Sequence, residues 1–280
     1  MKDIVQQRLD QYQVTSMEAE ELALKEITQE ILLFALSTTG FFHEAAFVGG
    51  TVLRILHGLD RFSEDLDFSL LAEDPGFALG DFLETAAKRM TSYGYQFDVS
   101  ASKNAMGVQR CMMRDNALTG VLELSYIKDL RKKIRVKVEV DTRPPEGATS
   151  TMEYHLFPQD FTLKVHTPES LFAGKVHALL CRPFIKGRDW YDFGWFVRRG
   201  VSVNGAMLKS ALHQAGPWKG QVLDVSTEFV VDRLSARIQE LDWEEVRRDV
   251  SPLLGPGQRE ALVVWSGALF LKKATLVRVV

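Results

Sequence analysis

Cysteine is scarce in this sequence of 280 residues, which contains only Cys111 and Cys181. Two cysteines without CxxC spacing argue against a disulfide framework and a structural zinc site, and they are typical of a reducing cytosol. Long apolar runs are also missing, since no stretch approaches the roughly 20 residues that a membrane-spanning helix needs. The first residues, MKDIVQQ, lack the apolar core of a signal peptide. These absences predict a cytoplasmic protein with no membrane partner.

A large charge of either sign is absent as well. The formal net charge is -3 and the sequence pI is about 6.1, so any binding of nucleic acid must come from a local patch. The densest group of basic residues lies between positions 128 and 137 and consists of Lys128, Arg131, Lys132, Lys133, Arg135 and Lys137. It is a candidate contact for nucleic-acid phosphates, although a solvated turn between strands explains it nearly as well.

The sequence has no internal repeat or low-complexity tract, and its hydrophobic share of 46% supports a substantial core. The clearest break is the Pro-Pro-Glu-Gly run at positions 144–147. We therefore expect an N-terminal helical cover over residues 1–44, a core domain over 45–145 and a mainly helical C-terminal domain over 146–280.

Apolar periodicity and turn residues predict a mixed α+β fold, in which a mixed sheet is flanked by helices. Helices are expected over 3–39, 51–57, 77–93 and 168–181, with a further helix capped by Asp189 and three or four helices after residue 203. Strands are expected over 45–48, 65–70, 95–100, 108–113, 121–127 and 134–142, followed by an edge hairpin over 151–165.

The stretch FVGGTVLRILHGLDRFSEDLDFSL, residues 47–70, carries the clearest chemical signal. Asp65 and Asp67 are two residues apart on an expected strand, so both side chains point to the same face. Two carboxylates held this close repel each other unless a cation lies between them. Mg²⁺ is the economical choice, because it is bound by one or two carboxylates together with substrate phosphates.

Two neighbouring features suit the same chemistry. Gly49 and Gly50 precede an expected helix, whose free N–H groups can bind a phosphate, although a plain tight turn is the simpler interpretation. The strand over 134–142 alternates apolar and charged residues, so Glu139 or Asp141 offers a third carboxylate. A solvated strand face would show the same alternation.

Beyond this stretch lie PESLFAGKVHALL and KGRDWYDF, and the motifs together resemble the AbiEii/AbiGii-type toxins of type IV toxin–antitoxin systems. The resemblance covers about residues 47–197, with four separated motifs in the expected order. These toxins are nucleotidyltransferases of the polymerase-β type. The resemblance implies a nucleotidyltransferase core, a C-terminal helical domain, an NTP substrate and two Mg²⁺ ions.

The resemblance also implies a role for each residue that matches a motif. The triphosphate would be bound by Gly49, Gly50, Thr51, Arg54, Ser63 and Lys175. The metal ligands would be Asp65, Asp67 and Glu139, with Asp141 as the alternative to Glu139. Asp189 and Asp192 would complete the fourth motif of the catalytic site. Some relatives are silenced by phosphorylation at the hydroxyl before the two aspartates, which makes Ser63 a candidate regulatory site.

The acceptor implied by the resemblance is the 3′ end of tRNA, and its modification would arrest translation. The neighbouring gene would encode an AbiEi-type antitoxin, whose direct contact with this chain the sequence leaves open. Two alternatives remain: transfer of the nucleotide to a protein or a small molecule such as an aminoglycoside, and a non-catalytic binding module.

Overall fold

The computed structural model describes residues 2–105, 107–129 and 131–280, which form two compact units. The first, called here the sheet unit, contains Met1–Leu56, Phe62–Pro144 and Met152–Val165. The second, the helical unit, contains His57–Arg61, Pro145–Thr151 and His166–Val280. Each unit is therefore assembled from segments that are far apart in the sequence.

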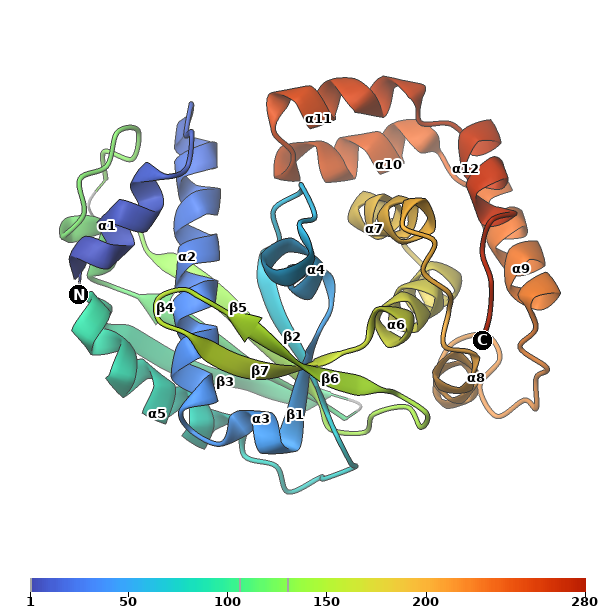
Figure 1. Ribbon diagram of the computed structural model, residues 1–280, viewed down its shortest axis with the longest axis horizontal. Helices are drawn as coiled ribbons and strands as arrows, with labels where there is room; N and C mark the ends of the chain where they lie inside the picture. The colour runs from blue at the N-terminus through green and yellow to red at the C-terminus, as the bar shows by residue number, and fades with distance from the viewer. Residues whose placement is uncertain (1, 106, 130) are drawn as a thin grey trace. The chain divides into compact units, whose positions relative to one another are not determined.

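A seven-stranded sheet with the order β3-β4-β5-β2-β1-β7-β6 forms the centre of the sheet unit (Figure 1). Its strands are β1 (Ala45–Val48), β2 (Asp65–Leu70), β3 (Phe97–Ala105), β4 (Val108–Asp115), β5 (Ile134–Asp141), β6 (Ser150–His155) and β7 (Phe161–His166). The pair β2–β5 is parallel, whereas β1–β2, β3–β4 and β4–β5 are antiparallel. The prediction of a mixed sheet flanked by helices is confirmed, and the expected hairpin forms the β7-β6 edge.

One face of this sheet is apolar and covered by helices. Leu66 and Phe68 of β2 and Val138 and Val140 of β5 are buried on it. The helices α2 (Met17–Ser37) and α5 (Leu79–Met90) pack on this side, against β3, β4 and β5. Because side chains alternate along a strand, the acidic residues of β2 and β5 point to the other face, as the alternation predicts.

The N-terminal helix expected over 3–39 is wrong in one respect, because the chain breaks between α1 (Lys2–Asp10) and α2. Ser16 starts α2 by accepting a hydrogen bond at its side-chain oxygen from the backbone N–H of Ala19. This cap satisfies an N–H group that a helix leaves without a partner at its first turn. Two short helices complete the unit, α3 (Phe41–Glu44) and α4 (Gly50–His57), whose last residue belongs to the helical unit.

The strand expected over 121–127 is also wrong. Residues 118–120 form a short 3₁₀ turn, and the backbone N–H groups of Ser125, Tyr126 and Ile127 all donate to the carboxylate of Glu20, at 2.6 to 2.9 Å. Glu20 lies on α2 and is buried. The anion therefore satisfies backbone donors that a strand would give to its neighbour.

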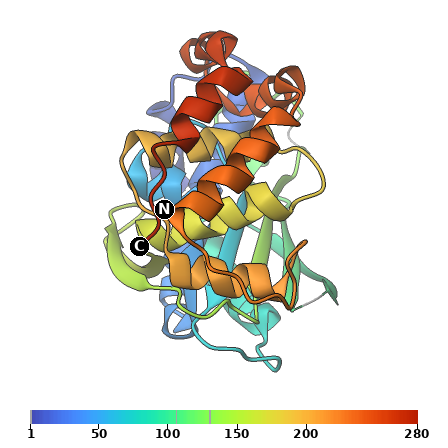
Figure 2. The ribbon, with the colours of Figure 1, turned by 90° about the vertical axis from the view of Figure 1, so that its right-hand side faces the viewer.

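The helical unit is built from α6 (Pro168–Cys181), α7 (Gly187–Arg198), α8 (Gly205–Gln214), α9 (Thr227–Gln239), α10 (Trp243–Val250), α11 (Pro256–Glu260) and α12 (Gly267–Ala274). The five helices after residue 203 exceed the three or four expected. Figure 2 shows α9 and α12 side by side. The core of the helical unit is aromatic, with Trp190 and Phe193 of α7 packed on Phe270 of α12.

Two further observations concern the helices. The expectation that Asp189 caps a helix is wrong, because α7 begins two residues earlier and Lys186 occupies the cap position. Pro168 begins α6 as predicted. In the part of the chain that the structure describes, every helix is too short or too polar to cross a membrane.

Candidate active site

Four charged side chains lie together on the face of the sheet opposite to α2 and α5. In the parallel register of β2 and β5, Asp65 is opposite Lys137 and Asp67 is opposite Glu139. Residues directly opposite each other point to the same face, so this register brings three carboxylates and one ammonium group together. The side chains of Asp65 and Glu139 are only 23% and 21% exposed. Solvent and salt therefore screen their attraction to the ammonium group less than at an exposed surface.

Lys137 lies between two of the carboxylates. Its Nζ atom is 3.1 Å from Oδ2 of Asp65 and 3.2 Å from Oε2 of Glu139. Burial alone would lower the pKa of Lys137, but the charges and hydrogen bonds of Asp65 and Glu139 raise it above its ordinary value. The group is therefore a permanent cation at neutral pH.

Arg110 of β4 lies opposite Glu139 in the antiparallel register and donates to Oε1 of that residue. Burial would raise the pKa of Glu139, yet the hydrogen bond from Arg110 and the charge of Lys137 hold it below its ordinary value. Both carboxylate oxygens of Glu139 thus have a cationic partner.

These contacts bear on the expected metal centre. Oxygen donors such as those of Asp65 and Asp67 suit a hard cation like Mg²⁺. However, no three carboxylate, imidazole or thiolate groups within residues 2–105, 107–129 and 131–280 are arranged to hold a metal ion. The expected third ligand, Glu139, is engaged by two cations. Its alternative, Asp141, lies two register positions farther along, opposite Ser69, and accepts a hydrogen bond from the backbone N–H of Arg143.

The glycine turn lies directly against the second aspartate. β1 ends at Val48, as the sequence predicts, and Val48 pairs with Asp67; α4 begins at Gly50, one residue before the expected start. Gly49 has a φ of +84°, and a Cβ atom at this position would be 2.6 Å from Oδ2 of Asp67. Only glycine allows this turn and this approach together.

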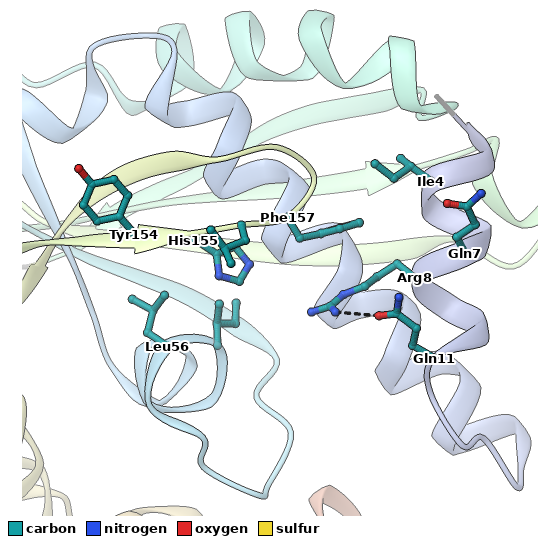
Figure 3. A pocket seen from close by; sticks show the side chains of 10 residues that line it. Ile4, Gln7, Arg8, Gln11, Leu56, Tyr154, His155 and Phe157 are labelled. Atoms are coloured by element: carbon teal, nitrogen blue, oxygen red, sulfur yellow. Dashed lines mark hydrogen bonds between the residues drawn. The ribbon is translucent and has the colours of Figure 1, made fainter.

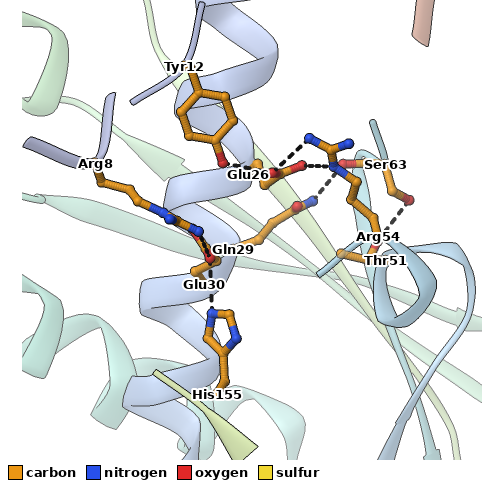
Figure 4. A network of polar contacts seen from close by, with 9 residues as sticks. All are labelled: Arg8, Tyr12, Glu26, Gln29, Glu30, Thr51, Arg54, Ser63 and His155. Atoms are coloured by element: carbon orange, nitrogen blue, oxygen red, sulfur yellow. Dashed lines mark hydrogen bonds and ion pairs between the residues drawn. The ribbon is translucent and has the colours of Figure 1, made fainter. Parts of the chain in front are cut away.

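Thr51 and Ser63 connect the glycine turn to the start of β2. The Thr51 hydroxyl is hydrogen-bonded to the Ser63 hydroxyl at 2.8 Å and to the backbone carbonyl of Asp65 at 2.5 Å. The amide of Gln29 donates to the carbonyl of Ser63 (Figure 4). Thr51 is buried, so its contribution is to hold Ser63 and β2 in place beside the turn.

Arg54 is directed towards α2. Its guanidinium group forms an ion pair with Glu26 of α2, with contacts of 2.6 and 3.1 Å, and lies over the ring of Phe62. Figure 4 shows the Tyr12 hydroxyl on the same carboxylate. The positive charge that was expected to face a triphosphate is therefore matched by a carboxylate within the sheet unit.

In the helical unit, the third and fourth motifs form one ionic cluster. Nζ of Lys175 on α6 is 2.6 Å from Oδ1 of Asp189 and 2.8 Å from Oδ2 of Asp192, both on α7. Arg182 also binds Asp189. Burial would raise the pKa of Asp189, but Lys175 and Arg182 lower it below its ordinary value. The structure thus brings together the three residues that the sequence assigned to these motifs.

Arg61 is a member of this cluster that the sequence did not reveal. It is buried, and it binds Asp192 through two hydrogen bonds of 2.6 Å. In these contacts three cations, Arg61, Lys175 and Arg182, face the two carboxylates. A lone arginine four residues before Asp65 resembles a surface residue in sequence, and only its burial marks it.

The sheet unit also contains a cavity of about 500 Å³ away from these residues (Figure 3). It is lined by Ile4, Gln7, Arg8, Gln11, Ile55, Leu56, Tyr154, His155, Leu156 and Phe157. Arg8 and His155 both bind the buried carboxylate of Glu30. The cavity wall is thus held to α2 by Glu30, while the residues expected from the motifs lie elsewhere.

The comparisons with known proteins agree with the motifs. A sequence model of the family described as "Nucleotidyl transferase AbiEii toxin, Type IV TA system" matches residues 31–264. No curated protein matches the chain.

Two solved structures are similar in fold. MenT4, a nucleotidyltransferase toxin from Mycobacterium tuberculosis, is 19% identical with a TM-score of 0.53, and the match covers 97% of this chain and 99% of that one. JHP933 from Helicobacter pylori is 18% identical with a TM-score of 0.50, covering 90% and 89% of the two chains.

Proposed function

Because this chain belongs to the AbiEii family of nucleotidyltransferase toxins of type IV toxin–antitoxin systems, we propose that it transfers a nucleoside monophosphate from an NTP to the 3′ end of tRNA. The observation that supports the site is the register of β1, β2 and β5, which places Asp65, Asp67 and the Gly49 turn side by side. The acceptor would lose its ability to serve in translation, and the protein would act in the cytoplasm.

The reaction is an in-line displacement at the α-phosphorus. The oxygen of an acceptor hydroxyl attacks it and the hydroxyl proton is released to solvent, while the bond to the α,β-bridging oxygen breaks and pyrophosphate leaves. The backbone N–H groups of Gly49 and Gly50, at the start of α4, bind phosphate oxygens. Asp65 and Asp67 would hold the metal, and Mg²⁺ at such a pair would neutralise charge around the α-phosphate. The family resemblance assigns Lys175 to the nucleotide phosphates, and the presence of three cations in its cluster supports that role.

A polyanionic acceptor is supported by two arginines on the face of the sheet opposite to α2 and α5. Arg114 of β4 and Arg135 of β5 are directly opposite each other, and both are exposed. Like charges opposite each other destabilise a strand pair. Among the described residues neither arginine forms an ion pair, although Asp98 of β3 is opposite Arg114, where it accepts a hydrogen bond from Asn116. Phosphates of an RNA strand would neutralise both arginines. Within the basic group expected from the sequence, Lys132 and Arg131 are already paired, with Glu21 and Asp129.

The test is transfer of label from each of the four NTPs in the presence of Mg²⁺ and total RNA. We expect label in RNase-sensitive material of tRNA size, and its loss in Asp65→Ala and Asp67→Asn. Glu84→Ala is the matched control, because Glu84 is an exposed carboxylate of α5, which packs on the other face of the sheet. Label that follows protein or an added aminoglycoside would replace tRNA as the acceptor. The absence of transfer with every NTP, or equal transfer by Asp65→Ala, would refute the proposal.

An antitoxin partner and a regulatory phosphorylation belong to the same proposal. The family implies an antitoxin, and we propose an AbiEi-type antitoxin encoded beside this chain. We also propose that phosphorylation of Ser63 inactivates the enzyme, since the Ser63 hydroxyl is bound to Thr51 next to the glycine turn. A phosphate there would repel the triphosphate.

A further inference from the structure

The space between Asp65 and Glu139 contains an ammonium group. In a site with two metal ions and three carboxylates, carboxylate oxygens of both strands would share this space with a metal. Lys137 is directly opposite Asp65 and two residues before Glu139, so the register of the sheet fixes it between them. Its contacts of 3.1 and 3.2 Å are charge-assisted.

We infer that Lys137 takes the place of a second metal ion, so that Asp65 and Asp67 bind a single divalent cation and the Lys137 ammonium group supplies the other positive charge. This inference rests on the proposed nucleotidyl transfer at the same site. It also means that Glu139 serves as an anchor for Lys137 and is not a metal ligand.

The contacts of Glu139 carry this inference. Its two oxygens are taken by different cations, Oε1 by Arg110 and Oε2 by Lys137. A metal bound by Glu139 would lie next to both cations and be repelled by them. Because Arg110 and Lys137 come from adjacent strands of the same sheet, neither can move away without leaving an anion partly buried.

The charges of the side chains around Lys137 also favour a single divalent ion. Among these five side chains alone, Asp65, Asp67 and Glu139 contribute three negative charges and Lys137 and Arg110 contribute two positive charges, a difference of one negative charge. One divalent ion gives the empty site a small positive charge that suits a triphosphate. A second divalent ion next to an ammonium group would be repelled by it.

The side chain of Lys137 is 34% exposed, and its ammonium group lies next to the carboxylate that would bind the metal. The third N–H of this group can therefore donate to a phosphate oxygen. We expect it to bind the NTP from the β5 side, while the Gly49 turn binds it from the β1 side. Lys137 would thereby neutralise phosphate charge without needing a second ion.

The test counts metal ions directly. Mn²⁺ is titrated into the full chain and followed by electron paramagnetic resonance, first alone and then with a non-hydrolysable α,β-methylene NTP. We expect one Mn²⁺ per wild-type chain under both conditions. Lys137→Met, which keeps an unbranched side chain but removes the ammonium group, should bind a second Mn²⁺ or bind the first at least about tenfold more tightly.

Lys133→Met is the matched control, because Lys133 is an exposed lysine just before β5, and its Mn²⁺ count should equal that of the wild type. Lys137→Arg keeps the charge and should also bind one ion. Two Mn²⁺ in the wild type, or an unchanged count and affinity in Lys137→Met, would overturn the inference. If Lys137→Met fails to fold, the counts of the wild type and Lys137→Arg decide.

The same titration separates this inference from the proposed function. One bound Mn²⁺ together with no label transfer to RNA would support the inference and would refute only the proposed tRNA acceptor. Complete absence of Mn²⁺ binding would remove both the inference and the metal site of the proposed enzyme.

Discussion

Arg61 and Asp192 form a bidentate ion pair inside the helical unit, with Nε–Oδ1 and Nη2–Oδ2 distances of 2.6 Å. The side chains are 2% and 0% exposed, so the pair is out of reach of water. Planar guanidinium and carboxylate groups match in this geometry, which gives the contact direction as well as strength. Arg61 thereby orients the carboxylate that also accepts a hydrogen bond from Lys175.

Arg61→Ala should therefore destabilise the protein severely. Removing one partner of a buried pair costs about 3–5 kcal/mol when the other charge is left uncompensated. Asp192 keeps its contact with Lys175, so this range is the upper bound for Arg61→Ala. We expect a loss of up to this size in the free energy of unfolding, measured by urea denaturation at pH 7. Arg131→Ala removes an exposed pair with Asp129 and should leave the midpoint unchanged. Equal midpoints for the two variants would show that water reaches Asp192.

Ser63→Glu should abolish most of the transfer activity. The Ser63 hydroxyl is 2.8 Å from that of Thr51, beside the glycine turn, so a carboxylate there would repel an incoming triphosphate. We expect a fall in kcat/KM of at least about tenfold, dominated by a higher KM for the NTP. Ser92→Glu, at an exposed serine of the same unit, serves as the control. A Ser63→Glu enzyme with the KM of the wild type would contradict the regulatory proposal.

The parts of the fold that follow from local pattern could be predicted. Leu66 and Phe68 alternate with two aspartates, which is enough to specify both faces of β2. Pro168 after Thr167 is enough to place the start of α6. Such signals depend on neighbouring residues only, and backbone geometry carries them into the structure.

The errors and omissions arise from contacts between distant segments. Glu20 binds backbone N–H groups more than 100 residues away, and this contact replaces a strand that β-branched and aromatic residues favour. Arg61 meets Asp192 across 131 residues. Lys137 looks like the polar side of an alternating strand, and only the register of β5 on β2 shows that it lies between two carboxylates.

His166 should make the stability depend on pH between about 4 and 6.5. It is buried, and burial lowers its pKa from 6.5 to about 4. The unfolded chain therefore binds a proton in this window that the folded protein does not, so stability is complete above pH 6.5 and falls as the pH drops towards 4. A shift of this size corresponds to about 3 kcal/mol.

The measurement is urea denaturation between pH 7 and pH 4, with His166→Phe as the comparison. The variant lacks the titrating group and should lose less stability over this range than the wild type. Parallel curves for the two proteins would show that His166 is protonated in the folded state or is reached by water.

Gly49→Ala tests the approach of the glycine turn to Asp67. Its φ of +84° is strained for alanine, and the new Cβ would be 2.6 Å from Oδ2 of Asp67. Gly58→Ala is the matched control, because Gly58 has a φ of +69° but nothing within 4 Å of an added Cβ. Both variants should lose about 1–2 kcal/mol of stability through backbone strain. Only Gly49→Ala should displace a metal-binding carboxylate and lower kcat/KM, by at least about tenfold.

The comparison separates the contact of the new Cβ atom with Asp67 from the backbone strain. Both glycines have a positive φ, but only Gly49 lies next to another side chain. Mn²⁺ affinity provides the second measurement, and it should weaken in Gly49→Ala alone. If both variants keep the activity and the Mn²⁺ affinity of the wild type, Asp67 can turn away from the added methyl group without consequence. The carboxylate orientation seen beside Gly49 would then not be the one used in the reaction, and Asp65 would have to provide the main metal contact.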